Sequence, residues 1–317
     1  MDEVARQLLR ALRGARSQVA FARRAGYRSN PVAEWEAGRR SPTATEVLRI
    51  CRVIQVDVDG ALARFHPEAA RAFATGGVAA WLDTLRGDEP VLAVAARVGR
   101  SRFAVARWLS GEAEPRLADF LALVEAITGR VADLVALLVP IADVPALAGR
   151  AAALAAGRRL SREQPWSGAF VAALDTAWYR ALPAHPDGVI AGLFGIPVET
   201  ERACLSDLLA GGVIERDGGR YVLRRPLVID TGGEAAVMRR IRAHWLEVAR
   251  VRTLDPRPDD AFAYNVFSVK SEDLDRIREL YRAFFREVRQ IVAASEPTDT
   301  VALLAIQLLD WPTPPMD

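Results

Sequence analysis

The chain has 317 residues, of which 51% are hydrophobic and 26% charged, a composition typical of a folded protein and not of a disordered one. This length is long for a single helical core and suits two or three domains. Residues 1–78 carry 13 basic and 8 acidic side chains, whereas residues 79–150 carry 8 and 9, and residues 166–317 carry 18 and 22. The excess positive charge therefore lies in the first quarter of the chain, where it would favour binding to phosphate groups.

Several classes of protein are excluded by simple features. The two cysteines, Cys51 and Cys204, are far apart in sequence, so a disulfide framework is not expected. The first residues are acidic and lack the apolar stretch of a secretory signal. Charged residues interrupt the most apolar region, 117–141, at intervals that a membrane span would not tolerate. We therefore expect a cytoplasmic, nucleoid-associated protein with no membrane contact.

The segment from Ser17 to Gly38 predicts two short helices joined by a tight turn. Ser17 is predicted to cap the first helix, and Gly26 to end it. Pro31 is compatible with the start of the second helix, because the first helical N–H groups have no partner inside the helix. The positions that a helix-turn-helix needs are filled by Gln18, Ala22, Gly26, Val32, Trp35 and Gly38.

The same pattern returns 73 residues further on without a gap, which predicts a second copy over residues 79–141. Among the first-copy positions that are identical in the second are Leu9, Leu12, Arg13, Gly14, Ala22, Gly26, Val32, Trp35, Gly38, Pro42, Leu48 and Pro67. Their partners are Leu82, Leu85, Arg86, Gly87, Ala95, Gly99, Val105, Trp108, Gly111, Pro115, Leu121 and Pro140.

Both copies resemble the lambda-repressor-like, xenobiotic-response-element type of helix-turn-helix found in bacterial transcription regulators. The first copy has every element of the family's pattern, namely Ser17, Gln18, Ala22, Gly26, Val32, Trp35, Glu36, Gly38 and Pro42. The resemblance implies a five-helix domain whose third helix enters the major groove of DNA. In that arrangement the first residues of the helix, and one residue a turn later, contact base edges.

Carried over by position, the resemblance implies two sets of DNA-binding residues in the first copy. The expected base-reading residues are Ser29, Asn30 and Glu34, with Arg28 beside them. The expected phosphate contacts are Gln18, Arg39 and Arg40. The alternative is that the arginines at 23, 24, 39 and 40 form an ordinary solvated face. The local excess of positive charge favours the phosphate interpretation.

The second copy departs from the family's pattern, because Val91 and Leu109 stand where the first copy has Gln18 and Glu36. The residues at its reading positions are Arg100, Arg102, Phe103 and Arg107. Arginines at these positions could pair with guanine, or could form ion pairs with Glu112 and Glu114. Two interpretations stay open: a second DNA-reading head, which would let one chain cover two half-sites, or a degenerate copy kept for packing or dimerisation.

Residues 142–164 are rich in alanine, glycine and arginine and predict a helical or partly flexible linker. Residues 165–230 then predict a winged helix, with one helix over 170–182, others over 188–194 and 199–210, and a hairpin over 213–223. Its third helix is expected to expose Glu199, Glu201 and Asp207, with Arg202 the only base. Because carboxylates repel phosphate, a protein-contact or scaffold role is favoured here.

Residues 231–317 predict an α+β segment for regulation or dimerisation. A helix is expected over 234–252 with Val237, Ile241, Trp245 and Val248 on its buried side, then strands over 263–269 and 301–309. Between the strands, Ser271 is predicted to cap a long helix. Its apolar stripe is formed by Leu274, Ile277, Tyr281, Phe284, Val288 and Ile291. Packing of this stripe on a sheet is the favoured interpretation, and a dimer seam stays open.

Residues 166–317 as a whole resemble a C-terminal domain of unknown function that follows a lambda-repressor-like module in bacterial regulators. The resemblance rests on the winged-helix segment, residues 264–288 and residues 301–312, and it implies a regulator without assigned catalytic residues. No nucleophile motif, phosphate loop or metal-ligand spacing occurs, so we expect no enzyme activity, cofactor or metal site. His66, His185 and His244 are isolated in sequence and predicted to be surface or helix-end residues.

The expected fold class is mainly α, with two tandem five-helix domains (1–78 and 79–141), a linker, and an α+β domain containing a winged helix. The expected function is that of a sequence-specific transcription regulator, repressor or activator, that binds double-stranded DNA as a homodimer. The alternative is a protein-interaction regulator that acts on another DNA-bound protein. A small-molecule or protein effector at the C-terminal domain stays open.

Overall fold

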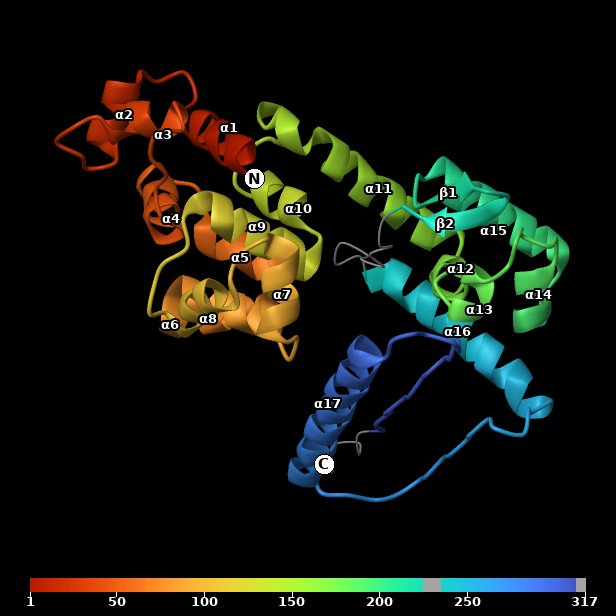
Figure 1. The fold of residues 1–317 in the computed structure, drawn as a ribbon. Coiled ribbons are helices and arrows are strands. Elements are labelled where there is room, and N and C mark those ends of the chain that lie inside the picture. Colours follow the sequence, from red (N-terminus) through yellow and green to blue (C-terminus); the bar gives the residue numbers. More distant parts are fainter. Residues whose placement is uncertain (225–234, 312–317) are drawn as a thin grey trace. The chain divides into compact units, whose positions relative to one another are not determined.

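The computed structural model describes residues 1–224 and 235–311. Over these residues the protein is mainly helical and contains a two-stranded sheet, which confirms the mainly α fold class (Figure 1). The chain divides into two compact units, residues 1–154 and 155–317. No helix in the described part of the chain is long and apolar enough to cross a membrane.

The first unit contains the segments predicted as two helix-turn-helix copies, here called the first and second copy, and five helices fall in each. The first copy consists of α1 (Asp2–Arg13), α2 (Gln18–Arg24), α3 (Pro31–Glu36), α4 (Ala44–Val53) and α5 (Val58–Phe65). The second consists of the latter part of α6 (Pro67–Arg86), then α7 (Val91–Val98), α8 (Arg102–Ser110), α9 (Leu117–Thr128) and α10 (Val131–Ala136). Two short 3-10 turns, η1 (Ile141–Asp143) and η2 (Pro145–Leu147), lead to α11 (Ala148–Glu163).

The predicted boundary between the copies falls inside α6. Gly77 adopts φ +64°, a left-handed conformation that kinks the helix one residue before the expected end of the first copy. Glycine has no Cβ, so it can adopt this conformation without the steric cost that other residues pay. The chain therefore passes from one copy to the next through a bend in the helix.

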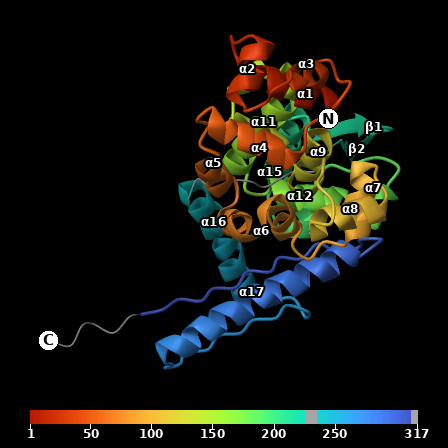
Figure 2. The same cartoon turned by 90° about the vertical axis from the view of Figure 1, so that its left-hand side faces the viewer.

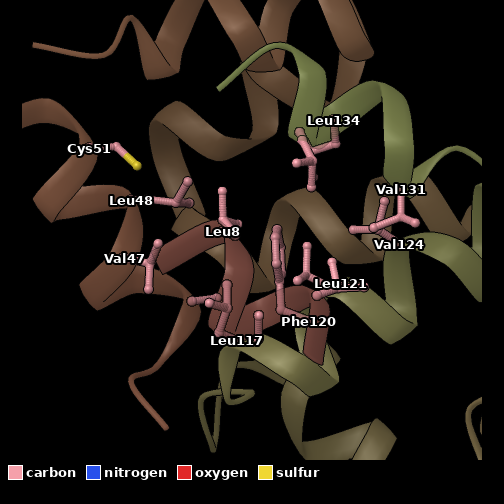
Figure 3. Close-up of a cluster of buried hydrophobic side chains, with 14 of the residues drawn as sticks. Leu8, Val47, Leu48, Cys51, Leu117, Phe120, Leu121, Val124, Val131 and Leu134 are labelled. Carbon is pink, nitrogen blue, oxygen red and sulfur yellow. The ribbon is translucent and has the colours of Figure 1, made fainter. Parts of the chain in front are cut away.

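The two copies share a single apolar core, although the sequence predicts two separate domains. Leu8, Val47, Leu48 and Cys51 of the first copy belong to the same buried cluster as the second copy's side chains (Figure 3). The second-copy residues labelled there are Leu117, Phe120, Leu121, Val124, Val131 and Leu134. Burial also raises the pKa of the Cys51 thiol to about 12, which keeps it protonated and unreactive.

The second unit begins with the helices and hairpin of the expected winged helix. These are α12 (Ser167–Leu174), α13 (Ala177–Arg180), α14 (Val189–Phe194), α15 (Val198–Ala210), β1 (Ile214–Asp217) and β2 (Arg220–Leu223). The strands pair antiparallel, with Ile214 opposite Leu223 and Asp217 opposite Arg220, as the hairpin prediction requires. The single helix predicted over 170–182 is instead two helices. Thr176 breaks it, because its backbone is extended and its hydroxyl donates to the carbonyl of Ala173 at 2.6 Å.

The rest of the unit consists of α16 (Ala235–Leu254) and α17 (Ser271–Ala294). Val237 on α16 is buried, as predicted, whereas the other three residues predicted on its buried side, Ile241, Trp245 and Val248, are half-buried. The boundary predicted at residue 230 and the predicted helix start at Glu234 lie outside the described residues. Helix α17 begins at Ser271, but the N-cap position is Lys270, so the predicted serine cap is wrong.

The strands predicted over 263–269 and 301–309 do not form. Both segments are extended but have no strand assignment within the described residues. A strand needs a neighbouring backbone to pair with, and neither segment pairs with one in the described part of the chain. The later segment runs back along α17, where Tyr281 donates to the carbonyl of Ile306 and Arg278 pairs with Asp310 (Figure 2). The expectation that the stripe of α17 packs on a sheet is therefore also wrong.

Candidate nucleic-acid interface

The helix-turn-helix of the first copy starts with a capped helix and a glycine turn. The hydroxyl of Ser17 accepts a hydrogen bond from the backbone N–H of Ala20 at 3.2 Å, as an N-cap should. Phe21 and Ala22 bury the inner face of α2. Gly26 then adopts φ +89° after the helix, so the predicted cap and turn are both confirmed.

The inner face of α3 packs against the rest of the module, while the residues that lead into its N-terminus are exposed to solvent. Pro31 occupies its first turn, and Val32 and Trp35 are buried. The ring of Tyr27, in the turn before α3, packs edge-on against Trp35 with centroids 5.4 Å apart. These anchors fix the helix against the body of the module, while Arg28 and Ser29 at its entry are exposed.

A second group of polar contacts supports the turn, and the sequence analysis did not identify it. Tyr27 donates its hydroxyl hydrogen to Glu46 on α4, and Arg49 donates to both the Tyr27 oxygen and the carbonyl of Ala25, each at 3.0 Å. Burial and the neighbouring carboxylate raise the pKa of Tyr27 to about 12. The tyrosine therefore stays a neutral hydrogen-bond donor at physiological pH.

Glu36 joins three helices of the module. Its carboxylate is only 6% exposed and receives hydrogen bonds from Arg13 on α1, at 2.6 Å, and from Gln18 on α2, at 2.8 Å. Its backbone carbonyl accepts from Arg10. The predicted phosphate contact Gln18 is thus half-buried and holds the N-terminus of α2 to the C-terminus of α3 in this structure.

Asn30, a predicted reading residue, has an unsatisfied polar atom. Its side-chain Oδ1 is buried and has no hydrogen-bond donor within the described residues, and it does not cap α3. Leaving a buried acceptor unpaired costs roughly 1–3 kcal/mol. Rotation of the amide outward would remove this cost if a donor were supplied from outside, and the exocyclic amino group of adenine is such a donor.

The remaining predicted residues of the first copy divide into paired and unpaired side chains. Glu34 and Arg39 form a bidentate ion pair at 2.6 and 2.9 Å, and Arg39 lowers the pKa of the Glu34 carboxyl. The side chains of Arg28 and Arg40 are exposed and make no ion pair in the described part of the chain. The structure therefore brings two free cations and one neutralised pair to the face around α3.

The second copy has a capped helix and glycine turns at the equivalent positions, with different surface chemistry. Ser101 caps α8 by accepting from the N–H of Ala104 at 3.2 Å, and Gly99 and Gly111 are left-handed at the ends of α7 and α8. Arg102 is exposed, and the ring of Phe103 is 78% exposed. The reading positions of this copy therefore present one cation and one aromatic ring to solvent.

The other two residues predicted to bind DNA in the second copy form ion pairs within the protein. Arg100 pairs with the largely buried Asp119 at 2.7 Å. Arg107 lies 3.8 Å from Glu112, and both side chains are largely exposed, so this pair is weak and easily exchanged. Of the two predicted acidic partners, Glu112 is thus found near Arg107.

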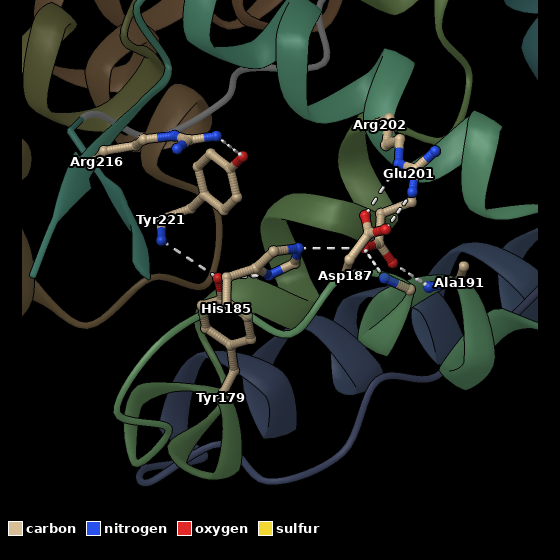
Figure 4. Close-up of polar contacts among 9 residues, drawn as sticks. Tyr179, His185, Asp187, Ala191, Glu201, Arg202, Arg216 and Tyr221 are labelled. Carbon is tan, nitrogen blue, oxygen red and sulfur yellow. Dashed lines mark hydrogen bonds and ion pairs between the residues drawn. The ribbon is translucent and has the colours of Figure 1, made fainter. Parts of the chain in front are cut away.

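Helix α15, the third helix of the predicted winged helix, differs from the prediction. Glu201 is fully buried and accepts from the N–H groups of Gly188 and Ala191, which start α14, and from His185 at 3.1 Å (Figure 4). Of the three acids predicted to be exposed, only Glu199 is exposed, since Asp207 is half-buried and accepts from Gln164. The expected acidic face of α15 is therefore wrong.

His185 is also not the isolated residue that the sequence suggests. Its ring nitrogens lie 3.1 Å from Glu201 and 3.1 Å from the hydroxyl of Tyr179, and Tyr179 in turn accepts from the backbone N–H of Tyr221 on β2 (Figure 4). This chain of hydrogen bonds links α13, α14, α15 and the hairpin. Arg202, on the outer face of α15, pairs with Asp187.

Comparison with protein families gives two matches. Residues 5–65 match the family described as a helix-turn-helix domain, and residues 184–310 match a domain of unknown function, DUF4423. No curated protein and no solved structure matches the chain significantly. The chain therefore carries a helix-turn-helix domain at its N-terminus and a DUF4423 domain in its C-terminal part, and the first of these indicates a DNA-binding regulator. The second copy lies outside both matched ranges.

Proposed function

We propose that this protein is a sequence-specific DNA-binding transcription regulator that places α3 in the major groove. The observation that carries the proposal is the arrangement around α3: a buried inner face, an exposed start at Arg28 and Ser29, and the unpaired amide oxygen of Asn30. It acts by binding and not by catalysis. Whether it represses or activates depends on where its sites lie relative to promoters.

The side chains around α3 divide into base-reading and phosphate-binding roles. Asn30 is suited to adenine, which offers a donor and an acceptor in the major groove. Arg28 and Arg40 are free to bind phosphates on either side. A DNA phosphate can also compete with Glu34 for the guanidinium of Arg39. When Arg39 binds the phosphate, the Glu34 carboxylate is free to accept a hydrogen bond from the amino group of cytosine.

The direct test uses the full chain and a duplex that it selects from a random-sequence library. Replacing Arg28 and Asn30 together by alanine is expected to lower affinity for this duplex by about tenfold to a hundredfold, since one good base contact contributes roughly 1–3 kcal/mol of discrimination. Fluorescence anisotropy measures the change. Arg71→Ala, which removes an exposed arginine from α6, is the matched control and should leave affinity nearly unchanged. Equal affinity of the double variant and the wild type would refute the role of α3.

A second candidate function is supported by the exposed apolar side chains of the second copy. Phe103 on α8 and Leu92 on α7 are 78% and 65% exposed, and such residues suit contact with another protein better than contact with phosphate. In this case the chain would act on another DNA-bound protein. Absence of DNA retention at low salt would favour this function over the first.

We also propose that the chain forms a homodimer through α17 and the extended segments on either side of it. Large apolar side chains are exposed there, among them Leu280, Ile291, Val292, Tyr264, Val266 and Leu309. A stable interface needs about 800 Å² from each partner, which roughly ten such side chains can supply. Acidic and basic residues alternate along α17, so two copies would not repel each other.

Charged substitutions on α17 test this proposal. Leu280→Glu with Ile291→Glu is expected to convert a dimer into a monomer, because the carboxylates could not be buried in the interface. Light scattering coupled to gel filtration gives the mass. Since both side chains are exposed in the single chain, the helical circular dichroism should stay the same. A wild-type chain that is monomeric at tens of micromolar would contradict the proposal.

A further inference from the structure

The two copies in the first unit are joined by a reciprocal pair of hydrogen bonds. The N–H of Ala44 donates to the carbonyl of Pro115 at 3.0 Å, and the N–H of Leu117 donates to the carbonyl of Pro42 at 2.9 Å. Leu117 is the residue 73 positions after Ala44, and Pro115 is 73 positions after Pro42. The hydrogen bond from the first copy to the second therefore joins the same pair of positions as the hydrogen bond from the second copy to the first. Such reciprocity is characteristic of a twofold interface.

The antiparallel bridge between Thr43 and Arg116 lies at the centre of this contact, and these two residues are also 73 positions apart. The helix contacts follow the same symmetry. Helix α4 packs on its counterpart α9, and α5 packs on its counterpart α10. Helix α1 also packs on α9. In the same way the latter part of α6, which corresponds to α1, packs on α4, which corresponds to α9. The shared core in Figure 3 is the interior of this symmetric pair.

We infer that residues 1–140 are a dimer within one chain, which presents α3 and α8 to two half-sites of the same DNA duplex. The loops that pair at the axis, 39–43 and 112–116, come directly after α3 and α8. Both reading helices therefore end beside the axis, one on each side of it. Twofold pairs of helix-turn-helix modules bind half-sites whose centres are about 10 base pairs apart or a multiple of that. This inference rests on the proposed function.

The two half-sites must differ in sequence, because equivalent positions carry different chemistry. Asn30 corresponds to Phe103, so an amide suited to adenine is replaced by a ring suited to the methyl group of thymine. Glu34 corresponds to Arg107, so an acceptor suited to cytosine is replaced by a donor suited to guanine. Ser29 corresponds to Arg102, which adds a second guanine-reading side chain. A single chain therefore recognises an asymmetric operator.

The charges of the two copies indicate which half-site contributes more affinity. The first copy carries the positive excess and the side chains of Arg28 and Arg40, which are exposed and make no ion pair with any residue that the structure describes. In the second copy Arg100 is held by Asp119, and the net charge of residues 79–150 is −1. Phosphate binding therefore comes chiefly from the first copy, and the second copy adds sequence discrimination.

Selection of DNA from a random library by the full chain tests the inference. We expect two unlike motifs at a fixed spacing, whatever the number of chains bound, because the two helices belong to one compact unit with a shared core. Arg102→Ala with Arg107→Ala should remove the second motif and keep the first. Arg28→Ala with Asn30→Ala should remove the first. These side chains are exposed or half-buried, so each variant is compared with wild type for its unfolding midpoint, and Arg71→Ala is again the control.

The outcomes separate this inference from the proposed function. The Arg102 and Arg107 variant could still select a single motif, or an inverted repeat of one motif, as the wild type does. That result would overturn the inference that α8 binds a second half-site, and it would leave DNA binding by α3 intact. Absence of any enriched motif would overturn both. For the duplex with both motifs, the Arg102 and Arg107 variant should lose about tenfold or more in affinity, whereas a duplex with only the first motif should show no difference.

Discussion

Replacing Glu201 by leucine is expected to lower the free energy of unfolding of the second unit by about 3 kcal/mol or more. The carboxylate is fully buried and accepts hydrogen bonds from Gly188, Ala191 and His185. A leucine has no acceptor, so two N–H groups at the start of α14 and the imidazole would lose their partner. Urea unfolding followed by tryptophan fluorescence measures the loss, since Trp166 and Trp178 lie in this unit.

Glu199→Leu is the matched control for this prediction. Glu199 lies two residues earlier on the same helix and is exposed, so its replacement should change stability by less than about 0.5 kcal/mol. The loss of stability of Glu201→Gln should lie between those of the two leucine variants. The glutamine amide oxygen can still accept a hydrogen bond, but its NH₂ group would face N–H donors. If the Glu201 and Glu199 leucine variants unfold at the same urea concentration, the buried carboxylate does not stabilise the packing of α13, α14, α15 and the hairpin.

Glu36→Leu is expected to destabilise the first unit by about 2–4 kcal/mol. The substitution removes the acceptor shared by Arg13 and Gln18, and it leaves the partly buried guanidinium of Arg13 without its carboxylate. DNA affinity should fall as well, because Glu36 holds the ends of α2 and α3 together. Thermal unfolding gives the stability, and the equivalent change at Glu68, an exposed acid of α6, is the control.

The second copy supplies a compensating substitution. It has Val91 and Leu109 where the first has Gln18 and Glu36; Leu109 is buried in the shared apolar core, and Val91 packs against that core. Adding Gln18→Val to Glu36→Leu is therefore expected to recover about 1 kcal/mol, since the unpaired amide is replaced by an apolar contact. A double variant whose loss equals the sum of the single losses would show that Gln18 and Glu36 are not coupled.

Local features of the first copy could be predicted from sequence because short-range rules determine them. The cap at Ser17, the turn at Gly26 and the anchors Val32 and Trp35 all lie where the pattern places them. The hairpin over 213–223 was predictable for the same reason, since its turn residues are adjacent in sequence. Figure 1 shows the helices α2 and α3 and the hairpin of β1 and β2 that these residues form.

Features that depend on distant residues could not be predicted. Glu201 was expected on the surface because carboxylates are rarely buried, and the donors that satisfy it begin a different helix. The strands over 263–269 and 301–309 have the composition of strands, but a strand forms only where a second backbone lies beside it. The symmetric contact at Thr43 and Arg116 depends on how two copies pack, and the repeat alone indicated only that two copies exist.

The salt dependence of DNA affinity tests DNA binding by α3 most directly. Anisotropy titrations with the selected duplex between about 50 and 200 mM salt are expected to show a steep fall, with the logarithm of affinity declining by about 0.9 for each phosphate neutralised per unit of log salt. Arg40→Ala should weaken binding and reduce this slope by about 1. Affinity that stays constant as salt rises, with no effect of Arg40→Ala, would contradict DNA binding by the first helix-turn-helix.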